Sequence, residues 1–154
     1  MCILLRRLSL MLPVLWCVAP APSAVAGGPD IDIEDLKGSI WRSAEGWTVR
    51  LRCEVEIEDA RRGDRFELVF RLTERGQTVV DGAGYPVEVV VVLDRPVKVD
   101  DDEIEFRQAV RVKLPRHYIR DPKHLRVHAT VLRAGSNRAL EHESKSIKYK
   151  RHPD

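Results

Sequence analysis

The stretch from Trp47 to Glu58 alternates without interruption between apolar and polar side chains. Every odd position in it is apolar, and every even position is polar or charged. Successive side chains of a β-strand point to opposite faces, so this spacing predicts a strand with one buried face and one solvated face. A helix would distribute the same apolar residues around its whole axis. The buried face requires further strands to cover it.

The rest of the chain supplies strands of the same kind. Alternation or a short apolar run predicts strands over Arg65–Glu74, Val87–Leu93, Glu103–Leu114, His124–Arg133 and Arg138–Lys150. Turns recur about every ten residues, and no segment has a convincing helical period. We therefore expect an all-β fold, an antiparallel β-sandwich of about seven strands with an Ig-like or fibronectin-type arrangement. This is a prediction of architecture and carries no function by itself.

The alternation also predicts which side chains form the core. The expected core residues are Val49, Leu51, Val55, Phe66, Leu68, Phe70, Val89, Val91, Phe106, Val110, Val112, Val127 and Val131. Gln108 interrupts the apolar face of the strand Glu103–Leu114. A β-bulge or a partly open sheet edge would each account for a polar side chain at that position.

The N-terminal residues have a different character. Arg6 and Arg7 precede an apolar stretch, Leu8–Ala19, and the small residues of Ala24–Ala26 follow it. This is the layout of a secretory signal peptide that is cleaved before Gly27. A membrane anchor is the main alternative, but a span needs about 20 apolar residues, and prolines interrupt this stretch. A lipid anchor is a weaker one, because its cysteine would follow a large tryptophan.

The expected domain organisation follows from these two patterns. Residues 1–26 form the signal peptide, residues 27–46 a lead-in with at most a short edge strand, residues 47–150 a single β-sandwich and residues 151–154 a tail. The longest later apolar run, Val89–Leu93, has only the length of a strand, so we expect no membrane span after cleavage. The protein is therefore expected to be secreted or periplasmic.

Cys53 is the only cysteine outside the predicted signal peptide, because Cys2 and Cys17 lie within it. The cleaved chain therefore has no internal disulfide, although export would permit one. Cys53 lies on the apolar face of the first predicted strand, where a thiol behaves as a small hydrophobic group. A reactive thiol needs exposure and a positive neighbour, so we expect Cys53 to be buried and inert.

Charge is unevenly distributed along the chain. Residues 27–106 contain 11 basic and 20 acidic side chains, whereas residues 107–151 contain 13 basic and 3 acidic ones. The basic C-terminal third could form a surface for carbohydrate or another polyanion. The interpretation that we favour is that acidic and basic strands lie side by side and pair across the sheet.

Two groups of residues have the chemistry of metal ligands. His124 and His128 are four residues apart, which on a strand is about 13 Å and too far for one ion. The run Asp100–Glu103, with nearby Asp94, offers carboxylates of the kind that calcium prefers. A calcium loop usually spaces its ligands and contains a glycine, so a solvated turn is the favoured interpretation. We expect no metal and no cofactor.

The sequence contains no catalytic motif. Outside the signal peptide the serines are Ser39, Ser43, Ser136, Ser144 and Ser146, and none lies in a Gly-x-Ser-x-Gly or Ser-x-x-Lys motif. The glycine-containing segment Asp81–Pro86 leads to another strand, whereas a phosphate-binding loop leads into a helix. A hydrolase would have to assemble its site from scattered residues.

The sequence as a whole favours a secreted or envelope-associated, non-enzymatic domain that acts in binding or protein–protein interaction. The expected partner is an unknown protein or envelope polymer, not a nucleic acid. Recognition is expected at an exposed sheet edge or in the irregular segments Asp81–Pro86, Asp94–Glu103 and Pro115–Lys123. The alternatives are a carbohydrate- or polyanion-binding module that uses the basic C-terminal third and, less favoured, a small secreted hydrolase.

The signal-peptide hypothesis makes a direct prediction. Mass spectrometry of the exported protein should find Gly27 as its first residue, because Ala24–Ala26 provides the small residues that signal peptidase requires. An exported chain that still begins at Met1 would contradict it.

Overall fold

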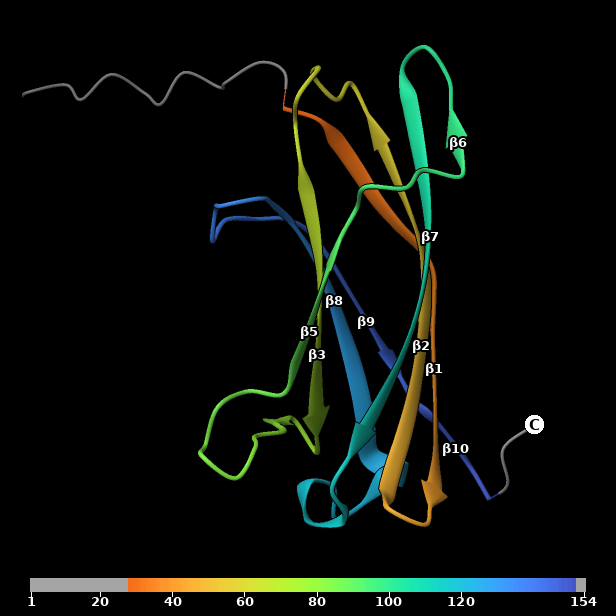
Figure 1. Cartoon of the computed structure of the whole chain (residues 1–154), viewed down its shortest axis with the longest axis vertical. Helices are drawn as coiled ribbons and strands as arrows, with labels where there is room; N and C mark the ends of the chain where they lie inside the picture. The colour runs from red at the N-terminus through yellow and green to blue at the C-terminus, as the bar shows by residue number, and fades with distance from the viewer. Residues whose placement is uncertain (1–27, 152–154) are drawn as a thin grey trace, which may run out of the picture.

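The structure, a computed structural model, describes residues 28–151 and is built from two packed β-sheets (Figure 1). The predicted signal peptide over Met1–Ala26 lies outside the described residues. Within residues 28–151 the helical elements are two short 3₁₀ turns, η1 (Arg116–Tyr118) and η2 (Pro122–His124), and no helix is long and apolar enough to cross a membrane. The prediction of an all-β sandwich is confirmed.

The first sheet has the strand order β10-β1-β2-β7-β6. Its strands are β1 (Asp30–Ser43), β2 (Gly46–Glu58), β6 (Lys98–Val99), β7 (Glu103–Leu114) and β10 (Lys148–Lys150). The second sheet has the order β4-β3-β8-β9, and β5 also pairs with β3. Its strands are β3 (Phe66–Glu74), β4 (Gln77–Thr78), β5 (Glu88–Val92), β8 (Leu125–Arg133) and β9 (Ala139–Ser146).

The topology is that of the Ig fold. The order β1-β2-β7-β6 in one sheet and β9-β8-β3-β5 in the other corresponds to strands ABED and GFC with one additional strand. All pairs are antiparallel except β1–β10, which is parallel. Strands β4, β6 and β10 are only two or three residues long, so the longer strands match the expected number of about seven.

The expected lead-in over residues 27–46 is in fact a major strand. The 14-residue β1 pairs with β2 along its length and with β10 on its other side. A β-bulge between Glu34 and Lys37, with Asp35 at a φ of 51°, interrupts the alternation of apolar and polar residues in β1. One extra residue reverses the alternation, so Ile33 points inward before the bulge and Leu36 after it.

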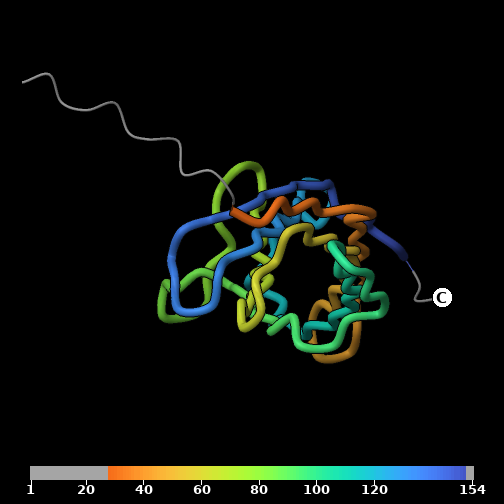
Figure 2. Tube along the Cα trace, turned by 90° about the horizontal axis from the view of Figure 1, so that it is seen from above, coloured from red at the N-terminus to blue at the C-terminus, as the bar shows by residue number. Residues whose placement is uncertain are grey.

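One side of the sandwich is closed by the C-terminal segment. The chain leaves the second sheet at the end of β9, passes through the buried Ile147 and joins the first sheet as β10 (Figure 2). Gly38 of β1 faces this crossing, and a Cβ atom on it would lie 2.8 Å from Cγ1 of Ile147. The glycine therefore allows the side chain of Ile147 to pack closely against the backbone of β1.

The predicted core is largely confirmed. Nine of the thirteen expected residues are buried: Val49, Leu51, Val55, Phe66, Leu68, Phe70, Phe106, Val127 and Val131. The other four, Val89, Val91, Val110 and Val112, are only partly buried and pack against the core from β5 and β7. We call the side of the sandwich that these four valines line the open side.

The open side exists because β6 is short. It pairs with β7 only at Ile104 and Glu105, which leaves residues 107–114 of β7 without a second neighbour among the described strands. The register between β2 and β7 continues through Gln108 without a shift. Gln108 therefore marks an open edge and not a β-bulge.

The centre of the core should be sensitive to truncation. Leu51 is 1% exposed in the central part of β2, so Leu51→Ala should destabilise the fold by about 2–5 kcal/mol through lost burial and a cavity. Urea unfolding measures this, with Val99→Ala as the control because Val99 is 64% exposed. Equal effects of the two variants would mean that the buried face has been misassigned.

Candidate functional site

The outer face of the first sheet carries its charges in two separate halves. The even positions of β2 point outward, and they change from Arg50 and Arg52 to Glu54, Glu56 and Glu58 along the strand. Because the flanking strands pair with β2 in a fixed register, each half extends sideways across the sheet. The result is one basic half and one acidic half on the same face.

The basic half contains Lys37 of β1, Arg50 and Arg52 of β2, Arg111 and Lys113 of β7, and Lys148 and Lys150 of β10. Arg50 is paired with Ser39 on one side and with Arg111 on the other, and Ser39 is paired with Lys148. Neighbouring strands lie about 4.8 Å apart, so Arg50 and Arg111 lie side by side, and Lys148 follows beyond Ser39 in the same row. Like charges opposed in this way repel unless an anion lies between them.

Few carboxylates neutralise the basic half. Lys113 pairs with Glu45 at 2.9 Å, and Lys37 pairs with Asp35 at 2.8 Å, both between exposed groups. Among residues 28–151, Arg50, Arg52 and Arg111 form no ion pair. Their guanidinium groups are therefore available to an external anion.

The surface of the basic half is hollowed in two places. A depression of about 430 Å³ lies between β1, β2 and β10, and one of about 520 Å³ lies between β1, β2 and β7. Arg50 and Arg52 line both. Trp41 lines the second and lies half-buried under Arg111, whose guanidinium carbon is 5.9 Å from the ring centre. The site thus combines cations with one aromatic surface.

The acidic half is partly neutralised from within. Arg107 pairs with Glu54 and with Glu105, each at 3.0 Å. Partial desolvation and the neighbouring carboxylates, beginning with Glu34, raise the pKa of Glu56. Among the described residues no group of three or more histidines, cysteines or carboxylates is arranged to hold a metal ion.

The expected pairing of acidic with basic strands is found in only part of this sheet. Acidic and basic strands do pair in the acidic half, as Arg107 and Glu54 show. In the basic half they do not, because the fold brings Arg50 and Arg52 from the acidic part of the chain beside Arg111 from the basic part. The basic C-terminal third does not form one surface, since other members of it, such as Arg126 in β8, belong to the second sheet.

The acidic run Asp100–Glu103 is a turn that holds a lysine. Lys98 Nζ lies 2.9 Å from a carboxylate oxygen of Asp100 and 2.9 Å from one of Glu103. These two hydrogen bonds raise the pKa of Lys98. The backbone N–H of Asp100 donates to the carbonyl of Glu103, which closes the turn. An ammonium group therefore lies where a calcium ion would have to share the same oxygens.

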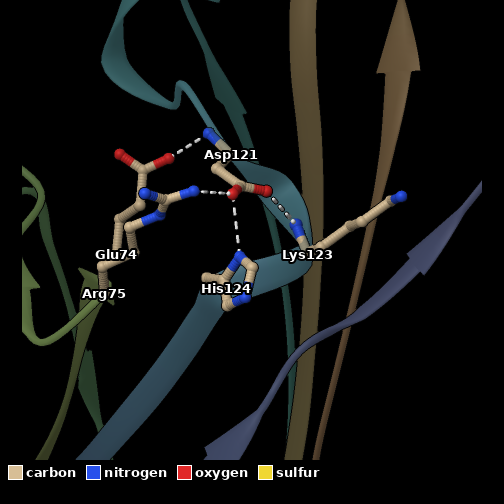
Figure 3. Close-up of polar contacts among 5 residues, drawn as sticks. All are labelled: Glu74, Arg75, Asp121, Lys123 and His124. Carbon is tan, nitrogen blue, oxygen red and sulfur yellow. Dashed lines mark hydrogen bonds and ion pairs between the residues drawn. The ribbon is translucent and has the colours of Figure 1, made fainter.

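A polar cluster around Asp121 joins two loops at one end of the sandwich (Figure 3). The Asp121 carboxylate accepts hydrogen bonds from Arg75 at 2.6 Å, from Nδ1 of His124 at 2.8 Å and from the backbone N–H of Lys123 at 3.3 Å. The backbone N–H of Asp121 in turn donates to Glu74. The cluster fixes the connection between β7 and β8 against the turn after β3.

The Asp121–His124 pair resembles part of a hydrolytic site but lacks the remaining groups. No serine, threonine or cysteine side chain among residues 28–151 hydrogen-bonds to His124, although general-base catalysis requires such a contact. Arg75 shares the carboxylate oxygen that contacts His124. The geometry therefore fits a structural link between loops.

The other predicted candidates are separated from one another. His128 contacts Thr73 and His142, with its Nδ1 3.2 Å from Nε2 of His142, whereas His124 contacts Asp121. Burial and then His142 lower the pKa of His128. The His128–His142 pair could not be predicted from the sequence, because only the register of β8 and β9 brings these residues together.

Cys53 is buried at 2% exposure, and burial, reinforced by Glu143, raises the pKa of its thiol to about 12. The expectation of a buried, inert cysteine is confirmed in its burial, and the raised pKa keeps the thiol protonated near neutral pH.

Comparison with known proteins adds little. No family model and no curated protein matches this chain. One solved structure with some similarity is HBP35 of Porphyromonas gingivalis, at 12% identity and a TM-score of 0.44. The match covers 77% of this chain and 40% of that chain. A likeness at this level carries no argument about function.

The Asp121 cluster should make the folding stability of the protein depend on pH in the acidic range. Its hydrogen bonds from Arg75 and then from His124 lower the pKa of Asp121 to about 2, compared with about 3.9 for a free aspartate. A carboxyl group whose pKa is lower in the folded state than in the unfolded state stabilises the fold at pH values above its unfolded pKa. This stabilisation is lost as the pH falls through the folded pKa. Asp121→Asn should therefore lower the melting temperature at pH 5–7, and the difference from the unmodified protein should shrink between about pH 4 and pH 2.

Asp101→Asn serves as the control, because the exposed Asp101 has no ion pair among residues 28–151. A melting difference for Asp121→Asn that does not change with pH would show that the carboxylate charge is not what stabilises the loops.

Proposed function

We propose that this protein is a non-enzymatic binding domain that acts outside the cytoplasm and captures an extended segment of a partner protein at its open side. The observation that carries the proposal is the incomplete burial of the inward-facing valines Val89, Val91, Val110 and Val112. Side chains on the core face of a sandwich are normally covered on all sides. An added strand with an aliphatic inner row would cover these four.

The free edge of β7 offers the main chain that such a strand needs. Residues 107–114 pair with β2 on one side and have no strand partner on the other among residues 28–151. Strand addition supplies main-chain hydrogen bonds for affinity and side-chain pockets at alternate positions for specificity. Strands that are not used in this way are normally protected by charges or by covering segments.

The exposed apolar residues lie in one stretch of the sequence, between β4 and β6. The large hydrophobic side chains that are exposed in the described residues are Val80, Tyr85, Val90, Val92, Val97 and Val99. All of them fall in the segment that runs from β4 through β5 to β6. The stretch runs along the sandwich from the end that holds residues 79–87, through β5 at the open side, to β6 at the other end (Figure 1). The extracellular setting rests on the predicted signal peptide.

A lysine on the inner face of the free edge should block the partner. Gln108→Lys places a charge where the inner row of an added strand would lie, so it should weaken partner capture at least tenfold. Ala109→Lys is the matched control, because it adds the same charge to the same strand on the outer face. Capture is measured from the native envelope fraction, and hydrogen exchange of the complex should show new protection in residues 107–114.

Equal capture by both variants, or protection confined to other residues, would contradict strand addition at β7.

The proposal that the protein is not an enzyme is tested by measuring substrate turnover. Hydrolysis of a glycan, ester or peptide panel that is abolished by His124→Ala in a folded protein would show that the protein is an enzyme.

A further inference from the structure

We infer that the basic half of the first sheet is a second binding site, which takes an anionic polysaccharide bearing carboxylate or sulfate groups. It lies on the outer face of the sheet, whereas the proposed strand-binding edge lies on the open side. The inference therefore does not rest on the proposed function, although β7 contributes residues to both sites.

The cations are arranged for a repeating ligand. Arg50, Arg111 and Lys148 form one row across four strands, and Arg52 follows two residues along β2. Rows on one face of a strand are about 6.6 Å apart, and adjacent strands are about 4.8 Å apart. A single small anion could contact one or two of these groups, whereas a polymer with regularly spaced charges could contact the whole array.

Arginine is suited to the charged groups of such a polymer. Its planar guanidinium binds a carboxylate or sulfate through two parallel hydrogen bonds, and its weak hydration lowers the cost of contact. Arg50, Arg52 and Arg111 have no ion pair within residues 28–151 that a ligand would first have to break. The guanidinium of Arg111 lies over the half-buried ring of Trp41, 5.9 Å from its centre, and this cation–π contact holds the cation at the surface.

The acidic half on the same face limits where the ligand can lie. Glu54 and Glu56 follow directly after Arg52 in the outward row of β2. A polyanion that crossed this boundary would meet carboxylates, so it should lie across the strands over the basic half. The two hollows lined by Arg50 and Arg52 run in that direction, from β10 and β1 to β7.

Other ligands fit these features less well. A second copy of the chain could place its acidic half on this basic half, but burying so many charged side chains carries a large desolvation cost. Single-stranded nucleic acid is usually bound by several stacking aromatic residues, and the basic half contributes only Trp41.

The test measures binding of a defined octasaccharide of galacturonate and of a sulfated octasaccharide, by calorimetry at low salt with the complete exported protein. Arg50→Ser combined with Arg111→Ser should reduce the affinity for at least one of them by tenfold or more. Arg62→Ser combined with Arg95→Ser is the matched control, because both are exposed loop arginines and the change in net charge is the same. The control should stay within twofold of the unmodified protein, and affinity should fall as salt is raised.

The single variant Arg52→Ser, at a more exposed position, repeats the measurement if the double variant melts at a lower temperature. Equal losses in the two double variants would overturn the site, because net charge alone would then explain the binding. Equal affinity for an uncharged octasaccharide, or tighter binding of a nucleic-acid oligomer of the same charge, would overturn the ligand class. A dimer in light scattering that both Arg50→Glu and Glu56→Arg dissociate would assign the face to a second copy.

Each variant should affect only one of the two binding sites. Gln108→Lys should leave oligosaccharide binding unchanged, and the Arg50/Arg111 variant should still capture the protein partner. Loss of both activities in either variant would show that the two surfaces are one site.

Discussion

The uninterrupted pairing of β2 with β7 is the constraint on which the rest of the structure depends. Every residue from Trp47 to Glu58 has a partner in β7 without a register shift. The inward positions of β2, such as Leu51 and Val55, therefore lie in a continuous buried row. A slip of one residue would turn that row outward and place Arg50 and Glu54 in the core.

The same register creates the charged face. Because β2 fixes which residues of its neighbours point outward, the change from Arg52 to Glu54 along one strand becomes a boundary across the sheet. The basic half collects side chains from four strands, of which β7 and β10 are far from β1 and β2 in sequence. A rigid sheet holds such an array with little loss of backbone entropy on binding, which favours the recognition of an extended ligand.

The core is covered on one lateral side of the sandwich and partly uncovered on the other, because the segments at the two edges differ in length. On one side the crossing from β9 to β10 covers the core, and the absence of a side chain at Gly38 allows Ile147 to fit closely. On the other side β6 contributes only two residues, so the valines of β5 and β7 remain partly uncovered. An edge left open beside exposed aliphatic residues is a liability for a free protein, and binding a partner strand removes it.

The sequence by itself determined the strands with clean alternation, the sandwich class and most of the core, because period-two burial is a local property that each strand carries in its own residues. It also predicted the burial of Cys53, and it left a β-bulge and an open edge as alternatives at Gln108. The sequence could not reveal β1 as a long strand, since the bulge at Asp35 reverses the alternation within it. Only the tertiary structure decided where charges meet, because Arg50 and Arg111 are neighbours through strand pairing and not through spacing along the chain. The same holds for Arg75, Asp121 and His124, whose contacts depend on how two loops meet at the end of the sandwich.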